Sequence, residues 1–479
     1  MSEHSDFDLI VVGGGGAGLS AAITAKRAGA NVMVLEADKR LGGATLIAGG
    51  VFYAAGTSVQ RARGIEDSAD AMFEHLMNLT QWELRPGLIR LISDQSGPTL
   101  EWLISLGVSF PTNLLTKGGP ERVYRAHPSH GLGTRIGEVL VNIAGAESVE
   151  HAVATRVRGL LYEEGAVCGV RTDDATLRAP HVLISTGGFG NNLDMIARLW
   201  PKALRHGDRL IAVHDSLPFI LGDGITMAEE IGAKIVGHDN GLLMPKTNHL
   251  GRRVLEGVFL PPWIALVNKE GRRFLDETQP YFISGFLLNQ QTDQVGYAVF
   301  DERAVREATQ DKSWTDPYGS SVSVPAWEEE TLRKKIAEGV IVQGDTIAEL
   351  AGKCGIDADA LTYTLSKYNA DCAKGADGEF LKKTHLRFPV VEPPFYASDI
   401  HACVIANTNA GLNIDQECRV LDDADRPIPG LYAAGEVLGC VQGRLYNAGG
   451  LGIGNAIILG RHAGQVIGEA IQAKRPSGE

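Results

Sequence analysis

The fold is decided by residues 8–18, which read Asp8-Leu-Ile-Val-Val-Gly-Gly-Gly-Gly-Ala-Gly18. The apolar run that ends at Val12 has the pattern of a short strand buried on both faces. Residues 19–28 follow as a predicted helix, and a second predicted strand over residues 31–35 leads into Glu36. A strand, a GxGxxG turn, a helix and an acid about 20 residues further on predict a binding site for the pyrophosphate of a dinucleotide.

Each part of this unit has a physical task. Gly13 permits the tight turn, Gly15 lets the pyrophosphate approach the backbone, and Gly18 lets the helix pack closely on the strand. The helix N-terminus offers free N–H groups to phosphates, and the carboxylate of Glu36 can accept a hydrogen bond from a ribose hydroxyl. The residues predicted to contact the cofactor here are Gly13, Gly15, Gly16, Ala17, Gly18, Glu36 and Ala37.

Composition limits the class of protein. The chain has 479 residues, of which 44% are hydrophobic, enough for two or three domains with sizeable cores. A net charge of −13 argues against nucleic acid and anionic membranes as partners. The six cysteines form no CxxC pair and have no metal-ligand spacing, and no apolar run approaches the roughly 20 residues of a membrane span. These features predict a cytoplasmic protein with reduced thiols, no bound metal and no membrane span.

Further glycine-rich motifs follow in a fixed order along the chain. They are Arg40-Leu-Gly-Gly-Ala-Thr45, Ala48-Gly-Gly50, Thr155-Arg-Val157, Ser185-Thr-Gly-Gly-Phe-Gly190, Gly222-Asp-Gly224 and Leu431-Tyr-Ala-Ala-Gly-Glu436. With them, nearly the whole chain resembles the FAD-binding family that includes fumarate reductases, succinate dehydrogenase flavoproteins, L-aspartate oxidases and 3-ketosteroid dehydrogenases. The resemblance implies FAD as cofactor and adds further contact residues: Gly43, Ala44, Thr45, Gly49, Gly50, Val157, Thr186, Gly187, Asp223, Glu436, Ala456 and Ile457.

The resemblance also bears on how the flavin is held and reoxidised. The succinate dehydrogenase branch links its flavin to a histidine, and the matching position here is Gly43, so we expect non-covalent FAD. No second strand–GxGxxG–helix unit follows, and we therefore expect no NAD(P) domain on this chain. The electron acceptor is expected to be external: a quinone, oxygen or an electron-transfer protein.

The resemblance implies a split domain organisation. We expect an α/β, Rossmann-like FAD-binding domain of the glutathione-reductase type, formed by residues 1–240 and 391–479. An α+β capping domain over residues 241–390 is inserted between them, and the stretch Pro389-Val-Val-Glu-Pro-Pro394 reads as the returning linker. Within the cap, residues 261–274 predict a strand–turn–strand with Gly271 in the turn, and residues 356–374 predict a helix.

The cap and the C-terminal motif depart from the fumarate reductase pattern. Where that pattern has cationic or histidine ligands for a dicarboxylate, this chain has Tyr281, Met244-Pro245, Asn407 and Leu451. A dicarboxylate would meet no countercharge there, and desolvating unpaired charge costs several kcal/mol. Fumarate reduction is therefore not expected.

The same positions resemble 3-ketosteroid dehydrogenases. There one tyrosine matches Tyr281, and a second, four residues before a glycine on the flavin loop, matches Tyr446 and Gly450. The resemblance implies that Tyr281 removes the α-proton of a cyclic ketone while flavin N5 takes a hydride. The Tyr446 hydroxyl and the Gly450 N–H would polarise the carbonyl, as neutral donors that strengthen when the enolate forms.

Several points stay open at the level of sequence. A third tyrosine could assist the base, and Phe110 and Tyr124 lie in the matching region as tentative substrate residues. Arg444 is either a loop charge or a contact to a polar or carboxylate group of the substrate. Apolar stretches at residues 258–266 and 282–288 favour a small apolar ketone, either a 3-ketosteroid or a smaller cyclohexanone-type ketone. The alternatives are a reductase of an unsaturated acid or enone, and a non-catalytic flavin-binding protein.

Overall fold

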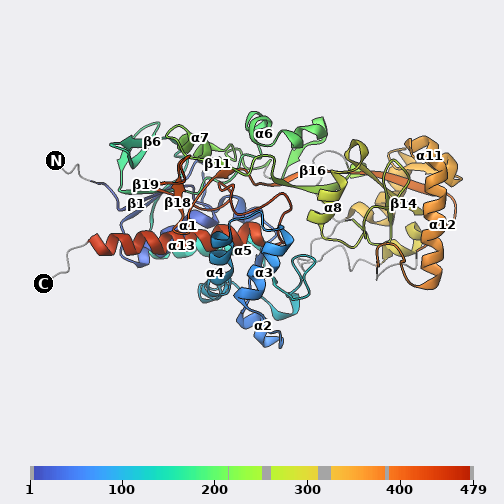
Figure 1. Ribbon diagram of the computed structural model, residues 1–479, viewed down its shortest axis with the longest axis horizontal. Helices are drawn as coiled ribbons and strands as arrows, with labels where there is room; N and C mark the ends of the chain where they lie inside the picture. Colours follow the sequence, from blue (N-terminus) through green and yellow to red (C-terminus); the bar gives the residue numbers. More distant parts are fainter. Residues whose placement is uncertain (1–4, 214, 251–259, 311–324, 383–387, 475–479) are drawn as a thin grey trace. The chain divides into compact units, whose positions relative to one another are not determined.

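The structure is a computed structural model that describes residues 5–213, 215–250, 260–310, 325–382 and 388–474 (Figure 1). The chain divides into two compact units. The first unit comprises Met1–Leu204, His214–Gly241 and Asn407–Glu479. The second comprises Arg205–Val213 and Leu242–Ala406.

The first unit is built on a six-stranded sheet in the order β18-β19-β9-β1-β2-β5. Its strands are β1 (Leu9–Val12), β2 (Val32–Leu35), β5 (Glu150–Ala152), β9 (His181–Ile184), β18 (Arg419–Leu421) and β19 (Pro427–Ala433). All neighbours pair in parallel except β18 and β19, which are antiparallel. The sheet therefore combines strands from both ends of the chain, with β1 near its centre.

The predicted strand and helix at the N-terminus are confirmed, with one shift of boundary. All four residues of β1 are at most 3% exposed, as expected for a strand covered on both faces. Helix α1 (Gly16–Arg27) starts three residues before the predicted Leu19. The Leu19 N–H donates to the Gly15 carbonyl at 2.9 Å, so the glycine turn itself forms the first helical turn.

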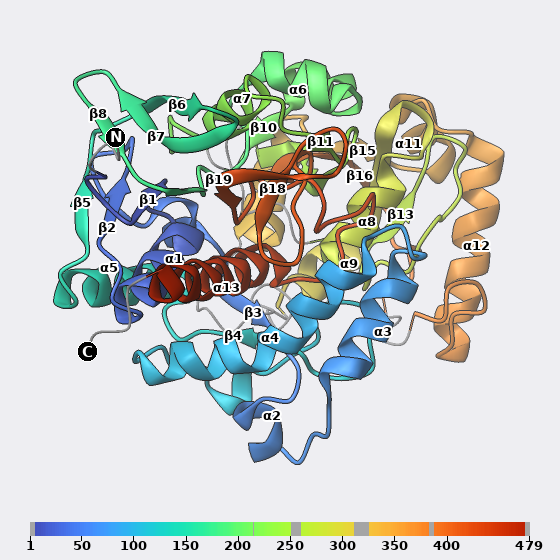
Figure 2. The same cartoon turned by 60° about the vertical axis from the view of Figure 1, so that its left-hand side comes forward.

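Helix α13 (Leu451–Lys474) packs against α1, and the two helices run side by side in Figures 1 and 2. Gly460, Gly464 and Gly468 recur every four residues on the contact face. A Cβ at Gly460 would lie 2.2 Å from the Ala17 carbonyl oxygen, and one at Gly464 would lie 2.5 Å from the Ala21 carbonyl oxygen. Only glycine therefore allows the two backbones to approach so closely.

Smaller elements surround this core. The remaining helices of the first unit are α2 (Ser58–Ala62), α3 (Ala69–Leu79), α4 (Pro86–Ser105), α5 (Leu132–Ala146), α6 (Leu193–Leu199) and α7 (Asp223–Glu229). The minor sheets pair β3 (Val51–Tyr53) with β4 (Ala126–Pro128), β6 (Val157–Glu163) with β7 (Ala166–Thr172) and β8 (Thr176–Arg178), and β11 (Ile235–Val236) with β17 (Gly411–Leu412).

The second unit has its own sheet, in which β16 (Phe395–Thr408) is the longest strand. Its order is β10-β16-β14-β13, and β12 and β15 also pair with β16. The partners are β10 (Ile211–Ala212), β12 (Gly241–Thr247), β13 (Ala265–Val267), β14 (Val295–Asp301) and β15 (Val342–Gly344). The helices are α8 (Tyr281–Leu288), α9 (Glu302–Glu307), α10 (Glu329–Ala337), α11 (Ile347–Cys354) and α12 (Ala358–Lys374).

For this region the predicted turn and helix are confirmed, whereas the second strand of the predicted strand–turn–strand is reduced to a single bridge between Val267 and Arg273. Gly271 has φ +68° and its N–H donates to the Asn268 carbonyl at 3.0 Å, which makes the predicted turn. Helix α12 starts at Ala358, two residues later than predicted, because the Asp357 carboxylate caps it by accepting from the Ala360 N–H at 2.8 Å. Of the apolar stretch 258–266, residues 258 and 259 lie outside the described part of the chain.

Within the described ranges, none of the helices combines the length and the apolar character that crossing a bilayer requires.

Candidate functional site

The glycine turn after β1 has the geometry of a phosphate cradle. Gly13 has φ +103°, and a Cβ there would lie 2.5 Å from the Ser185 carbonyl oxygen. A Cβ at Gly18 would lie 2.0 Å from the Gly13 carbonyl oxygen, so this residue sits at the contact of helix and strand. A Cβ at Gly15 would meet nothing within 4 Å. The turn is therefore tightly packed on one side and open where a ligand would approach.

Three segments distant in sequence meet at the start of α1. The Gly16 N–H donates to Thr45 Oγ1 at 3.0 Å, and a Cβ at Gly16 would lie 3.5 Å from Ile457 Cγ1. A Cβ at Gly435 would likewise lie 3.1 Å from Ala17 Cβ and 3.9 Å from Ala456 Cβ. The first unit thus brings together predicted cofactor residues from the N-terminal turn, the loop after β2 and the start of α13.

The Glu36 carboxylate is hydrogen-bonded to the glycine turn. Its Oε2 accepts from the Gly14 N–H at 2.7 Å and its Oε1 accepts from the Asp38 N–H at 2.8 Å. Burial raises the pKa of Glu36, while these backbone hydrogen bonds oppose the rise. Each carboxylate oxygen has more than one lone pair, so the carboxylate retains capacity to accept from a ribose hydroxyl. Ala37, which follows it, is half-buried.

A second group of predicted residues lies at the start of α7. The Gly224 N–H donates to Thr186 Oγ1 at 3.2 Å. The Asp223 carboxylate accepts two hydrogen bonds at 2.7 Å from the guanidinium of Arg156, the neighbour of Val157 in sequence. Asp223 therefore connects α7 to the start of β6. Its contact with the cofactor stays a prediction.

Glu436, one of the predicted FAD contact residues, is held in place by Thr408. Its Oε1 accepts from the Thr408 N–H at 2.9 Å and from Thr408 Oγ1 at 3.1 Å. A Cβ at Gly188 would lie 2.5 Å from the same oxygen, so the segment that contains Thr186 and Gly187 runs directly beside this carboxylate.

The loop from residue 43 to residue 50 completes the cradle. A Cβ at Gly43 would lie 3.2 Å from Gly15 Cα, and one at Gly50 would lie 2.1 Å from the Leu132 carbonyl carbon at the start of α5. Around Gly49, as around Gly15, there is open space within 4 Å. Ala44 is half-buried between these points. Open backbone at two glycines beside a helix N-terminus fits the pyrophosphate and ring system of FAD.

Tyr446 lies at the N-terminus of α13. Its side chain is buried, and its hydroxyl oxygen accepts a hydrogen bond from the Gly452 N–H at 2.7 Å. The first N–H groups of a helix have no intrahelical acceptor, so this contact satisfies one of them. A hydroxyl that accepts at its oxygen donates more strongly through its own hydrogen.

Gly450, the other predicted donor, occupies a backbone conformation that favours glycine. Its φ is +101°, and a Cβ there would lie 3.0 Å from Val51 Cγ1 and 3.1 Å from the Tyr53 nitrogen. Around the same loop stand two neutral residues, Asn407, whose amide lies near the Tyr446 hydroxyl, and Leu451. Neutral residues, and no cation, therefore stand at these two positions near Tyr446.

Tyr281, the predicted base, belongs to the second unit. It is the first residue of α8, is half-buried, and packs edge-on against Phe282 with ring centroids 5.7 Å apart. The segment before it is anchored by Glu277, whose carboxylate accepts from Arg273 at 2.8 and 2.9 Å and pairs with Lys382 at 3.1 Å. The side chains of this anchor are at most 1% exposed.

Phe110, Tyr124 and Arg444, the candidate substrate residues, make other contacts within the first unit. Phe110 is buried and packs against Phe52 with centroids 6.4 Å apart. Tyr124 is exposed, with the Arg63 guanidinium and the Lys117 ammonium over its ring at 5.1 and 5.8 Å. Arg444 is exposed and forms an ion pair with Glu83, as a loop charge does. None of these three contacts identifies a substrate.

Sequence reasoning missed Tyr53, a completely buried tyrosine of β3. It follows the Gly49-Gly50 pair by three residues, which is the signal that could have identified it. A Cβ at Gly118 would lie 2.6 Å from its ring. Burial raises the pKa of Tyr53 well above its ordinary value, and Glu121 adds to the rise while Arg125 opposes it. Tyr53 therefore stays protonated and supports the loop that carries Gly450.

Comparisons with known proteins agree with this geometry. A family model described as an FAD binding domain matches residues 8–453. The chain is 30% identical over 472 residues to a fumarate reductase (cytochrome) of Shewanella frigidimarina, covering 97% of this chain and 77% of that protein. It is 26% identical over 564 residues to the 4-oxocyclohexanecarboxylate 2-dehydrogenase of Sinomonas cyclohexanicum, covering 97% and 93% of the two chains.

Among solved structures, the chain is similar to a 3-ketosteroid-Δ4-(5α)-dehydrogenase from Rhodococcus jostii RHA1 in complex with 4-androstene-3,17-dione. The TM-score is 0.79 and the sequence identity is 25%, and the match covers 98% of each chain.

Proposed function

The chain belongs to the FAD binding domain family, and on this premise we propose that it is a dehydrogenase that inserts a C=C bond beside the carbonyl of a cyclic ketone. The protein is an FAD-binding oxidoreductase that acts on CH–CH groups. What is proposed is the direction of the reaction, the substrate class and the roles of individual residues.

The observation that carries the proposal is the hydrogen bond from the Gly452 N–H to the Tyr446 hydroxyl oxygen, 2.7 Å long. It fixes the oxygen of a buried phenol, a group that donates through its own hydrogen. Gly450, in the same loop, has no side chain to block its backbone N–H. Two neutral donors suit a ketone oxygen, which gains negative charge only as the reaction proceeds.

The chain's own residues would act as follows. The Tyr446 hydroxyl and the Gly450 N–H hold the carbonyl oxygen, which acidifies the neighbouring C–H. Tyr281, acting as the tyrosinate, accepts the α-proton at its phenolate oxygen and becomes a neutral phenol. FAD, when bound, supplies the acceptor for the hydride that leaves the β-carbon. The cradle of the first unit, with open backbone at Gly15 and Gly49, would hold the cofactor without a covalent bond, and an external acceptor would reoxidise it.

The neutral residues near Tyr446 weigh against a dicarboxylate substrate. Asn407 and Leu451 stand at positions where fumarate reductases have a histidine and an arginine, and neither residue carries charge. A buried carboxylate without a partner costs several kcal/mol. The two ketone-acting relatives, one named for 4-oxocyclohexanecarboxylate and one bound to 4-androstene-3,17-dione, support a cyclic ketone as substrate.

A second candidate is the reverse chemistry, reduction of an unsaturated acid or enone. The 30% identity to a fumarate reductase favours it. The same hydrogen-bond donors would stabilise the enolate formed from an enone, so the direction depends on the electron donor and acceptor and not on this loop.

Anaerobic flavin absorbance separates the two candidates. A panel of 3-ketosteroids, cyclohexanone and 4-oxocyclohexanecarboxylate is added to the oxidised holoenzyme, and one ketone is expected to bleach the flavin band. If no ketone does so, while an unsaturated acid reoxidises the dithionite-reduced enzyme, the reductase is the correct assignment.

Two variants test the residue roles. Tyr446→Phe removes the hydroxyl and should lower kcat by about 100- to 1000-fold while FAD stays bound. Tyr281→Phe should also lose most turnover. Tyr162→Phe, which alters an exposed tyrosine of β6, is the matched control and should retain the normal rate. Normal turnover in both Tyr446→Phe and Tyr281→Phe would refute the assigned roles.

A further inference from the structure

The Gly450 N–H, one of the two proposed donors to the carbonyl oxygen, takes its direction from the peptide that joins Gly449 to Gly450. Among the residues that the structure describes, this N–H has no acceptor. In a planar trans peptide the C=O and the N–H point to opposite sides. The contacts that fix the Gly449 carbonyl therefore also fix the direction in which the Gly450 N–H points.

Gly118 packs directly against this peptide, although it is distant in sequence. Its carbonyl oxygen accepts a hydrogen bond from the Gly449 N–H at 2.7 Å. A Cβ at Gly118 would lie 2.8 Å from the Gly449 carbonyl oxygen and 2.6 Å from the ring of Tyr53. Tyr53 belongs to β3, which packs against α13 (Figure 2). Gly118 therefore fits between the Tyr53 ring and the Gly449 carbonyl, where a larger residue would displace one of them.

The short turn Gly118-Gly-Pro-Glu121 is held by the carboxylate at its end. Glu121 Oε1 accepts a hydrogen bond from the Gly118 N–H at 2.6 Å. Pro120, within the turn, restricts the backbone further because its ring fixes φ. The segment is closed at its base by two hydrogen bonds between Thr116 and Ala126, at 2.9 and 3.0 Å. The position of Gly118 therefore depends on the Glu121 carboxylate within an otherwise restricted segment.

The Glu121 carboxylate is costly to bury at this place. Its side chain is 2% exposed, and its Oε2 has no hydrogen-bond partner in the described part of the chain. His75 Nε2 lies 3.9 Å from this oxygen, which is too long for a hydrogen bond. Burial raises the pKa of Glu121, and backbone N–H groups, among them that of Gly118, oppose the rise. The bond to Gly118 is therefore the contact through which Glu121 acts on the loop that carries Gly450.

We propose that Glu121 is a positioning residue of the carbonyl site: through Gly118 it holds the Gly449–Gly450 peptide so that the Gly450 N–H points at the ketone oxygen. This inference rests on the proposed function, which assigns the carbonyl site. All the residues of this chain of contacts belong to the first unit. A donor to the ketone oxygen stabilises the enolate more than the ketone, so its displacement should lower kcat and leave KM nearly unchanged.

Steady-state kinetics of the FAD-loaded enzyme with its best ketone test the role of the carboxylate. Glu121→Ala removes the acceptor of the Gly118 N–H and should lower kcat by about 10- to 100-fold, the scale for a displaced catalytic group. Glu121→Gln keeps an oxygen acceptor and should restore kcat to within about 3-fold of the parent value. The matched control is Glu101→Ala, because Glu101 Oε1 accepts from the Ser58 N–H at the same 2.6 Å in the same unit. This control should keep the parent kcat.

Gly118→Ala tests the same contacts with the carboxylate in place, and it decides the matter if Glu121→Ala does not fold. Its methyl group would press on the Tyr53 ring and on the Gly449 carbonyl oxygen. The variant should lower kcat on the same scale, about 10- to 100-fold, while the flavin content per chain stays at the parent level. Parent-like kcat in Gly118→Ala or in Glu121→Ala, or a Glu121→Gln variant as slow as Glu121→Ala, would overturn the proposal.

Binding of 4-nitrophenolate separates this proposal from the proposed reaction, because it needs no turnover. Its oxyanion resembles the enolate, and nitrobenzene, which lacks that oxygen, serves for comparison. Glu121→Ala should weaken phenolate binding by roughly 10- to 100-fold, the range for one charge-assisted hydrogen bond, and leave nitrobenzene binding unchanged. If no ketone is turned over but this difference is found, the positioning role stands and the reaction is wrong. If ketones are turned over but Glu121→Ala changes neither kcat nor phenolate binding, the positioning role is refuted.

Discussion

Replacing the buried carboxylate of Glu277 by an amide, Glu277→Gln, should strongly destabilise the second unit. Glu277 accepts two hydrogen bonds from Arg273 and pairs with Lys382, and the three side chains are at most 1% exposed. Arg273 keeps a second partner, Asp377, at 3.0 Å. The substitution therefore mainly removes the carboxylate that pairs with the buried Lys382 ammonium. Breaking a buried ion pair by removing one partner costs about 3–5 kcal/mol.

The pH dependence of this contribution has a definite sign. Burial alone would raise the pKa of Glu277, but Lys382 and Arg273 lower it below its ordinary value. The contribution is therefore fully present above the unfolded pKa of about 4.3. It is lost as the pH falls through the lower folded value. The difference between the parent protein and Glu277→Gln should accordingly shrink in acid.

Urea unfolding followed by circular dichroism at pH 7 measures the effect. The matched control is Glu379→Gln, which removes an exposed carboxylate 3.5 Å from Lys367 and should cost at most about 1 kcal/mol. Adding Lys382→Met to Glu277→Gln should restore part of the lost stability, because the stranded charge is then gone. A Glu277→Gln variant no less stable than Glu379→Gln would refute the reasoning.

Two other predictions concern the first unit. Gly460→Ala places a methyl group 2.2 Å from the Ala17 carbonyl oxygen. It should lower the free energy of unfolding by about 1–3 kcal/mol and lower the FAD content per chain, as urea unfolding and flavin absorbance would measure. The control Gly145→Ala, in α5 where the space is open, should be neutral or slightly stabilising in the same measurements. Burial lowers the pKa of His181 to about 4 from 6.5, so stability should fall as the pH drops through this window, by up to about 3 kcal/mol. The slope should flatten in His181→Leu but persist in His151→Leu, an exposed histidine; equal slopes in both variants would contradict this assignment.

The nucleotide-binding part was predictable because its signals are local. Strand β1, the glycine turn and helix α1 are adjacent in sequence, and the period of the apolar residues fixes each of them. The boundary error at α1 arose because glycines are poor helix formers by propensity. Here Gly18 lies within the helix, where a Cβ would be 2.0 Å from the Gly13 carbonyl oxygen and 2.6 Å from Ser185 Oγ, so tertiary packing selects glycine against its helix propensity.

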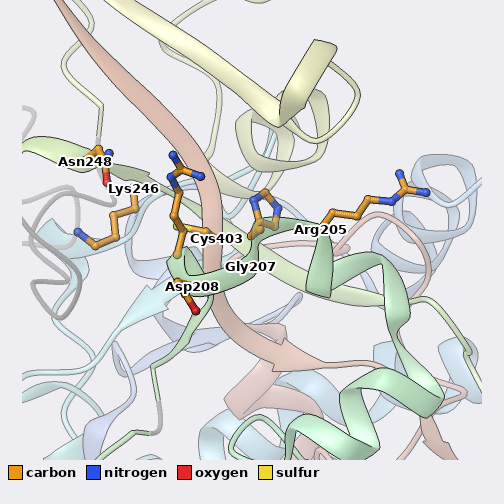
Figure 3. A pocket seen from close by; sticks show the side chains of 8 residues that line it. Arg205, Gly207, Asp208, Lys246, Asn248 and Cys403 are labelled. Carbon is orange, nitrogen blue, oxygen red and sulfur yellow. The ribbon is translucent and has the colours of Figure 1, made fainter.

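The candidate site was harder to derive, because its parts depend on tertiary contacts. The sequence indicated Tyr446, but no pattern indicated that its hydroxyl oxygen would accept from the Gly452 N–H. Tyr53 was not predicted because a single buried tyrosine produces no periodic pattern in the sequence. The pocket lined by Lys246 and Cys403 (Figure 3) could not be predicted either, because β12 and the chain around β10 come together only through pairing with β16. The roles of Tyr281 and Gly450 stay predictions.

The packing of α13 on α1 has a consequence for how the protein is made. The Gln472 amide donates to the Ala28 carbonyl oxygen across 444 positions of sequence, and β18 and β19 complete a sheet begun by β1. At about 5–20 residues per second, a ribosome that has released α1 would deliver α13 roughly 20–90 s later. During that interval the face of α1 that α13 will cover has no native partner. We therefore expect the nascent first unit to be exposed to chaperones during this interval, and FAD, whose predicted contacts include Ala456 and Ile457 of α13, to bind late.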